Sequence, residues 1–113
     1  DRYHLPLLIV ENGVGLDEDL DENGTIQDDF RVHYIEEHIK NVAAAIDDGV
    51  DCRGYLYWGP IDVVSAGTGE MKKRYGFVYV DRFNDGHGTL ERAIKQSYYR
   101  YKEIIESNGA CLE

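Results

Sequence analysis

The chain has 113 residues, with 12 Lys or Arg against 22 Asp or Glu, and its formal net charge of -10 argues against nucleic acid or an anionic membrane surface as a partner. This length allows one small hydrophobic core at most, and no apolar stretch approaches the ~20 residues of a membrane-spanning helix. Cys52 and Cys111 form no metal-binding or redox spacing, so we expect a reducing compartment, for which the cytoplasm is the best fit.

The first half of the chain predicts a strand followed by a helix. It begins at Asp1 without an initiating Met or a signal-peptide pattern, which we interpret as a cut in a longer protein. Residues 7–10 are all apolar, as in a parallel strand that is covered on both faces, and Gly13 breaks the run. A helical period then extends from residues 28–29 to a stop at Gly49. The apolar stripe of this helix consists of Ile35, Ile39, Val42, Ala43 and Ile46.

The second half repeats the same order of signals. Residues 52–62, "CRGYLYWGPID", are rich in aromatic side chains and have no helical stripe, which predicts a second strand. Residues 74–81, "RYGFVYVD", predict a shorter extended segment. A last helix is predicted from an N-cap at Thr89 to Gly109. Its inner stripe is expected to be Leu90, Ile94, Tyr98, Tyr101 and Ile105.

This order of elements defines an α/β fold that the chain cannot complete. Two strands joined through a crossover helix form a right-handed βαβ unit, but two strands do not close a sheet. A (β/α)8 barrel has about 250 residues or more, so two β/α units are a quarter of one. Barrel enzymes carry their chemistry at the carboxyl ends of the strands, where Glu11 and the residues after Tyr57 are expected to lie.

Three motifs, in order, carry a resemblance to one enzyme family. They are residues 9–13, "IVENG", residues 57–81, "YWGPIDVVSAGTGEMKKRYGFVYVD", and residues 95–105, "KQSYYRYKEII". Together they resemble glycoside hydrolase family 1 in its 6-phospho-β-glucosidase branch. The first is similar to the Ile/Val-Thr-Glu-Asn-Gly signature at the end of the seventh barrel strand, with Val10 where Thr is commoner, the second resembles the eighth strand and its loop, and the third resembles the closing helix. The resemblance covers nearly the whole chain and implies that residues 1–113 are a partial domain, the last two β/α units of the barrel.

The resemblance implies that Glu11 is the catalytic nucleophile. A retaining glycosidase attacks the anomeric carbon with one carboxylate and protonates the leaving group with a second carboxyl group ~5 to 5.5 Å away. The family's acid/base lies in an Asn-Glu-Pro motif that this sequence lacks, so we expect the chain alone to be inactive. Taken by itself, a Glu beside Asn12 and Gly13 is more typical of a turn, and it is the full context that favours catalysis. The resemblance implies no cofactor and no metal.

The loop after Trp58 bears on the substrate. Ordinary β-glucosidases of the family read roughly Trp-Ser-Leu-Leu-Asp-Asn-Phe-Glu-Trp here and hold sugar hydroxyls with the Glu, whose place falls on Ser65. A carboxylate there would repel a 6-phosphate, whereas a hydroxyl can donate to it. Lys73 and Tyr75 match the Lys-x-Tyr of the phospho-branch, so with Ser65 they form a predicted phosphate clamp. A bare basic run at 72–74 would otherwise indicate a solvated face.

Two neighbouring positions refine the expected sugar site. Ala66 stands where the family's phosphogalactosidases typically carry Trp, which favours a glucoside over a galactoside. Trp58 offers a flat apolar face for a pyranose ring, although an aromatic residue at a strand end is also common in cores.

Residues 19–26, "DLDENGTI", match the start of a Ca²⁺-binding EF-hand loop, but Phe30 replaces the bidentate Glu, so a turn is the preferred interpretation.

Three hypotheses follow from the sequence. The chain belongs to an enzyme that hydrolyses phosphorylated β-glucosides, or to a non-phospho β-glucosidase of the same family. Alternatively, the piece has no catalytic role and associates with other chains, or with the rest of a barrel, through its open sheet edges.

Overall fold

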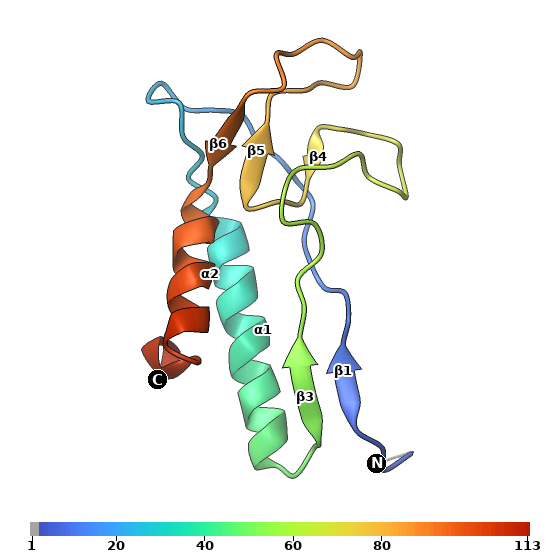
Figure 1. The fold of residues 1–113 in the computed structure, drawn as a ribbon, viewed down its shortest axis with the longest axis vertical. Helices are drawn as coiled ribbons and strands as arrows, with labels where there is room; N and C mark the ends of the chain where they lie inside the picture. The colour runs from blue at the N-terminus through green and yellow to red at the C-terminus, as the bar shows by residue number, and fades with distance from the viewer. Residues whose placement is uncertain (1–2) are drawn as a thin grey trace.

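The computed structural model describes residues 3–113, in which two parallel strands are joined by a long helix. Strand β1 (Leu7–Ile9) pairs with β3 (Cys52–Tyr55), and α1 (Asp29–Asp47) connects them along one side of the pair (Figure 1). The parallel pair with its crossover helix confirms the α/β pattern. No helix within residues 3–113 is long and apolar enough to cross a bilayer.

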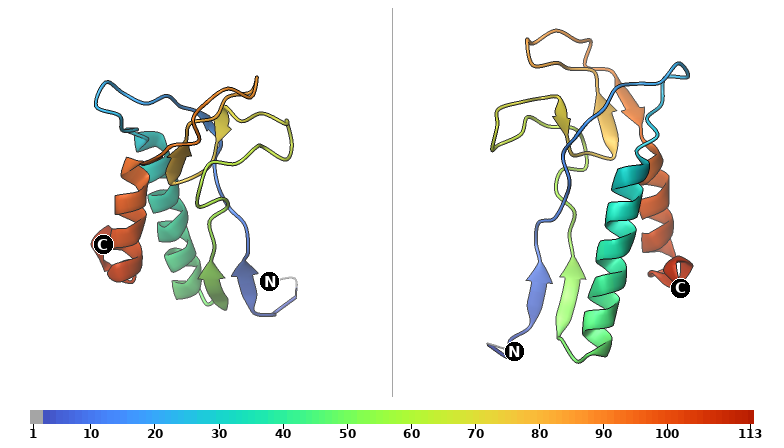
Figure 2. Two further views of the ribbon diagram at one scale, coloured as in Figure 1. Left: turned by 45° about the horizontal axis from the view of Figure 1, so that its top comes forward. Right: turned by 180° about the vertical axis from the view of Figure 1, so that it is seen from behind.

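The remaining short strands gather at the carboxyl ends of β1 and β3. Strand β2 (Leu16–Asp17) runs antiparallel to β4 (Lys73–Arg74), and β5 (Val78–Val80) runs antiparallel to β6 (Arg92–Ile94). Figure 2 shows these pairs beyond the ends of β1 and β3 from two further directions. Helix α2 (Gln96–Glu106) then lies beside α1, and the 3-10 turn η1 (Ala110–Leu112) closes the chain.

Helix α1 follows its sequence pattern only in part. Ile35 is buried, Ile39 and Val42 are half-buried, and the end of the stripe at Ile46 is exposed. Gly49 ends the helix as predicted, because its φ of 94° is in the left-handed region that favours glycine.

The small core lies between the two helices and the end of β3. Ile35 of α1, Phe77 and Ile104 of α2 are buried together. The ring of Phe77 stacks on Tyr101 with centroids 4.9 Å apart and meets Tyr57 at 4.5 Å. These aromatic contacts tie the loop before β5 to α2.

The predicted start of the last helix is wrong. Residues 92–94 form β6 instead, Lys95 is the N-cap, and α2 begins at Gln96. Leu90 has a φ of 66°, which a helix does not allow, and the Thr89 hydroxyl donates to Asp81 at 2.7 Å rather than capping a helix.

The later start also changes the inner face of that helix. Ile104 is its buried apolar residue, and the predicted Tyr101 is half-buried. The other predicted residues of the stripe are exposed, namely Leu90, Ile94, Tyr98 and Ile105. The two predicted extended segments are likewise interrupted. Strand β3 ends at Tyr55, and the chain turns at Gly59, whose φ is 71°. Residues 74–81 divide between β4 and β5.

The predicted burial of the first strand is not found within this chain. Leu7 is 52% exposed, Leu8 54% and Val10 69%. The radius of gyration is 15.9 Å, against about 13 Å for a compact domain of this length. Strand β1 thus has the composition of a covered strand, but residues 3–113 supply only one neighbour, β3.

Candidate active site

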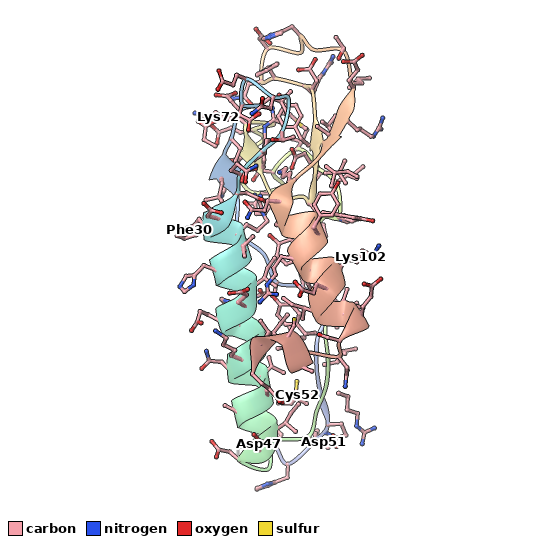
Figure 3. All side chains as sticks on the ribbon, turned by 90° about the vertical axis from the view of Figure 1, so that its left-hand side faces the viewer. Phe30, Asp47, Asp51, Cys52, Lys72 and Lys102 are labelled. Atoms are coloured by element: carbon pink, nitrogen blue, oxygen red, sulfur yellow. The ribbon has the colours of Figure 1, made fainter. Side chains whose placement is uncertain are left out.

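A cavity of about 440 Å³ opens at the carboxyl ends of β1 and β3. Figure 3 shows Lys72, from the loop beside this cavity, at the end of the molecule where α1 begins near Phe30, with Asp47 and Asp51 at the opposite end. The cavity is lined by Glu11, Asn12, Gly13, Trp58, Ser65, Ala66, Gly67 and Tyr75. The structure therefore brings Glu11, Trp58, Ser65 and Tyr75 of the predicted site together, although they come from distant parts of the sequence.

Glu11 is held at the cavity wall by its neighbours rather than by its own side chain. The Leu56 amide donates to the Ile9 carbonyl at 2.9 Å, and the Trp58 amide donates to the Asn12 carbonyl at 2.6 Å. The Tyr55 hydroxyl also donates to Asn12 Oδ1 at 2.5 Å. Within residues 3–113 the Glu11 carboxylate is exposed and has no hydrogen bond or ion pair. A rigid backbone therefore presents an unpaired carboxylate to the cavity.

Trp58 lines the same cavity as Glu11. Its side chain is 42% exposed, so one part of the indole is open to a ligand. A Cβ added at Gly13 would lie 3.5 Å from Trp58 Cβ, an ordinary contact that shows how closely the two segments run. An open aromatic surface next to a carboxylate is suited to a sugar ring.

Ser65 and Tyr75 also line the cavity, with Lys73 next to Tyr75. Ser65 is buried, its amide donates to the Glu70 carbonyl at 3.0 Å, and Lys73 Nζ lies 5.7 Å from the Tyr75 ring centroid. The Ser65 hydroxyl, and after it the Lys73 ammonium, lower the pKa of Tyr75, because both stabilise its phenolate. The three side chains are thus neighbours, although Lys73 does not itself line the cavity.

Gly15 leaves room for these side chains. A Cβ at this position would lie 2.7 Å from Lys73 Cγ and 2.7 Å from Tyr75 Cζ. Strand β2 pairs with β4 at this point, so Lys73 and Tyr75 lie directly over the glycine. This steric role of Gly15 was not predicted from the sequence.

A set of buried charged side chains, among them Arg74 between Lys73 and Tyr75, was also missed from sequence. We call it the buried ion network. It contains three cations and three carboxylates, which are Arg31, Arg74, Lys95, Glu18, Asp28 and Asp62.

The network is almost fully paired. Lys95 Nζ contacts Glu18 at 2.7 Å and Asp62 at 2.8 Å, and Arg31 contacts both Glu18 and Asp28. Burial lowers the pKa of Arg31, but its carboxylate partners outweigh burial and raise it. In the described part of the chain, Arg31 Nε is the one buried side-chain nitrogen or oxygen atom without a hydrogen-bond partner. The three positive and three negative charges balance, which offsets the cost of burying them. The ion pairs of the network link the loops that follow β1 and β3 to the starts of both helices.

The loop that resembled an EF-hand uses its carboxylate internally. Asp21 accepts hydrogen bonds from the Asn23 amide, the Thr25 amide and the Thr25 hydroxyl at 2.8 to 2.9 Å. Over residues 3–113 the structure contains no group of three or more His, Cys, Asp or Glu side chains arranged to hold a metal ion. Asp21 therefore forms a turn of the type expected from Asp and Asn in loops.

Known proteins resemble the chain in both fold and sequence. One solved structure similar to this chain is a β-glucosidase from Thermotoga maritima, with a TM-score of 0.81 and 35% sequence identity. The match covers 92% of this chain and 22% of that one. The chain is therefore a fragment of a (β/α)8 barrel. Residues 1–110 match the family described as "Glycosyl hydrolase family 1", and the chain belongs to this family.

Two of the similar curated proteins have the same description. The chain is 55% identical over 112 residues to a "6-phospho-beta-glucosidase" of Dickeya chrysanthemi, and 57% identical over 117 residues to one of Clostridium longisporum. These matches cover 99% and 100% of this chain, but 24% and 25% of those proteins. The chain thus spans about a quarter of the length of the curated relatives that it matches.

Proposed function

We propose that the chain is the C-terminal quarter, the last two β/α units, of an enzyme that hydrolyses 6-phospho-β-glucosides to glucose 6-phosphate and an aglycone or sugar. The observation that carries the proposal is the cavity that Glu11, Trp58, Ser65 and Tyr75 line together. A nucleophile and anion-binding donors in one cavity fit a substrate that carries both a glycosidic bond and a phosphate. The description of the similar curated proteins supports the same substrate class.

The reaction is a retaining double displacement. The Glu11 carboxylate attacks the anomeric carbon, the glycosidic bond breaks, and the leaving oxygen takes a proton from an acid/base residue that this chain does not contain. Water then attacks the glycosyl ester while the same acid/base removes its proton, which releases Glu11 and the sugar phosphate. An unpaired carboxylate is suited to this attack, because no existing hydrogen bond must be broken.

Recognition of the phosphate rests on the clamp of Ser65, Lys73 and Tyr75. The two hydroxyls donate hydrogen bonds, and the ammonium adds charge to them. A Glu at position 65 would instead place a negative charge near the phosphate, at a cost of about 4 kcal/mol per unit charge at ~4 Å near a protein surface. A small side chain at Ala66, which also lines the cavity, fits a glucoside in preference to a galactoside.

We place the reaction in the cytoplasm and expect the remainder of the barrel as the partner of this piece. Cys52 and Cys111 are free thiols, as expected of a reducing compartment. The exposed strand β1 offers an edge for a further strand. A second cavity of about 560 Å³, between the end of β3 and α2, is lined mainly by aromatic and apolar groups, among them Tyr57, Phe77 and Ile105. These surfaces suit either the rest of the barrel or a second copy of the chain.

Hydrolysis of non-phosphorylated β-glucosides is the alternative activity. Substitutions in the clamp, at positions 65 and 73, distinguish the two activities. The test uses the complete enzyme with paired kinetics on p-nitrophenyl β-glucoside, with and without the 6-phosphate. Lys73→Ala should lower kcat/KM for the phosphorylated substrate by roughly ten- to a hundredfold, since a charge-assisted hydrogen bond contributes about 1.5 to 3 kcal/mol. Ser65→Glu should shift preference toward the neutral substrate.

Lys72→Ala is the matched control. The neighbouring Lys72 is exposed, and its ammonium lies 3.8 Å from Asp17 and 3.9 Å from Glu70 rather than at the cavity. Its loss should leave the ratio of the two kcat/KM values unchanged. Equal losses on both substrates for Lys73→Ala and Ser65→Glu would refute the substrate assignment.

A further inference from the structure

The short strand β4 and the residue after it alternate between two environments. Lys73 and Tyr75 lie over Gly15 beside the cavity, whereas Arg74, between them, is 1% exposed and points into the buried ion network. Successive side chains of an extended segment point to opposite sides, so the position of Arg74 fixes the direction of both neighbours.

Arg74 is bonded to several separate segments. Its Nη1 donates to the Val80 carbonyl at 2.8 Å and contacts Asp62 at 3.3 Å, its Nη2 donates to the Arg82 carbonyl at 3.1 Å, and its Nε donates to the Glu18 carbonyl at 3.1 Å. The guanidinium also stacks on the Tyr79 ring, 4.1 Å from its centroid. Planar donors of this kind cannot be reproduced by an ammonium group.

We propose that Arg74 is a positioning residue for substrate recognition, whose buried guanidinium holds residues 73–75 so that Lys73 and Tyr75 face the same anion as Ser65. This inference rests on the proposed function, because it assigns a role in the phosphate site. Strand β4 has only two residues and one antiparallel partner, so its own ladder is a weak support. The bonds from Arg74 supply the rigidity that a multi-point anion site requires.

The alternative is that Arg74 only stabilises the fold. Lys95→Met provides the comparison, because Lys95 is also fully buried and contacts Asp62 and Glu18 of the same network, but it lies at the start of α2. A purely structural role predicts that loss of either cation affects both substrates alike. A positioning role predicts an effect on phosphate selectivity for Arg74 alone.

The experiment measures kcat and KM of the complete enzyme on the phosphorylated and unphosphorylated p-nitrophenyl β-glucosides, together with inhibition by inorganic phosphate. For Arg74→Lys we expect the ratio of the two kcat/KM values to fall about ten- to a hundredfold, mainly through KM, since a displacement of about 1 Å can cost a hundredfold. Inhibition by inorganic phosphate should weaken in parallel. For Lys95→Met the ratio should stay within about twofold of the parent value, whatever the change in melting temperature.

The outcomes separate this inference from the proposed function. If Lys73→Ala changes the ratio and Arg74→Lys does not, Arg74 has no positioning role and the substrate assignment stands. If Lys73→Ala itself leaves the ratio unchanged, the proposed function is wrong. Should Arg74→Lys fail to fold, Tyr79→Leu removes the ring under the guanidinium and leaves every ion pair in place. That variant should lower the ratio severalfold, and an unchanged ratio would overturn the inference.

Discussion

Replacing Gly15 with Ala should selectively damage recognition of the phosphate. The new Cβ would lie 2.7 Å from both Lys73 Cγ and Tyr75 Cζ. Carbon atoms in contact prefer about 3.5 to 4.0 Å, so the two side chains must move by at least about 0.8 Å. The new methyl group would clash with Lys73 at Cγ, near the base of the side chain. Rotation of the far end of the lysine side chain therefore cannot relieve the clash. The backbone itself tolerates alanine, because the φ of Gly15 is outside the left-handed region.

The size of the effect follows from what that displacement breaks. One charge-assisted hydrogen bond contributes about 1.5 to 3 kcal/mol, so losing one should reduce kcat/KM for the 6-phospho-β-glucoside about ten- to a hundredfold. The assay is paired kinetics on the two p-nitrophenyl glucosides. Gly67→Ala is the matched control, because a Cβ at Gly67, also at the cavity, would meet nothing within 4 Å. Equal loss on both substrates, or the same loss for Gly67→Ala, would refute the reasoning.

Three further predictions concern the nucleophile, the pH dependence and the isolated chain. Glu11→Gln should lower kcat of the complete enzyme by about three to six orders of magnitude without changing its melting temperature, and retained turnover would contradict the assignment. Because the pKa of Tyr75 is lowered from its ordinary value of about 10, its phenol loses the proton at a lower pH than an ordinary tyrosine, so KM for the phosphorylated substrate should rise as the pH approaches that pKa. The same rise in Tyr75→Phe would exclude Tyr75 as its source. The isolated 113-residue chain should associate on a sizing column, because Leu7, Leu8 and Val10 are exposed, and a monomer at every concentration would contradict this.

The sequence was sufficient for features that depend on local pattern and on a shared motif. The parallel strands and their crossover helix followed from apolar periods, and the stop at Gly49 followed from backbone freedom. Motif spacing identified the four predicted site residues that line one cavity, which are Glu11, Trp58, Ser65 and Tyr75. They meet there because a barrel brings the carboxyl ends of its strands together.

The sequence was insufficient where tertiary contacts override local preference. The residues after Thr89 have a helical apolar period, yet residues 92–94 pair with β5. Arg74 belongs to a basic run that is typical of a solvated face, but its partners come from positions 18, 62, 80 and 82. A single sequence shows no pairing between such distant positions, so the buried ion network could not be predicted.

The exposure of β1 has a different cause. Its residues have the composition of a strand covered on both faces, and that composition belongs to a complete sheet. Within this chain the strand has one neighbour, so apolar side chains remain exposed.

The central claim, that Glu11 attacks a 6-phospho-β-glucoside, is tested most directly by trapping the covalent intermediate. The complete enzyme would be treated with an activated 2-deoxy-2-fluoro-6-phospho-β-glucoside, which slows release of the sugar from the nucleophile, and then digested for peptide mass spectrometry. We predict one fluoro-phosphosugar attached to the peptide that contains Glu11, with far slower labelling by the unphosphorylated analogue. A label on another carboxylate, or equal labelling by both analogues, would contradict the account.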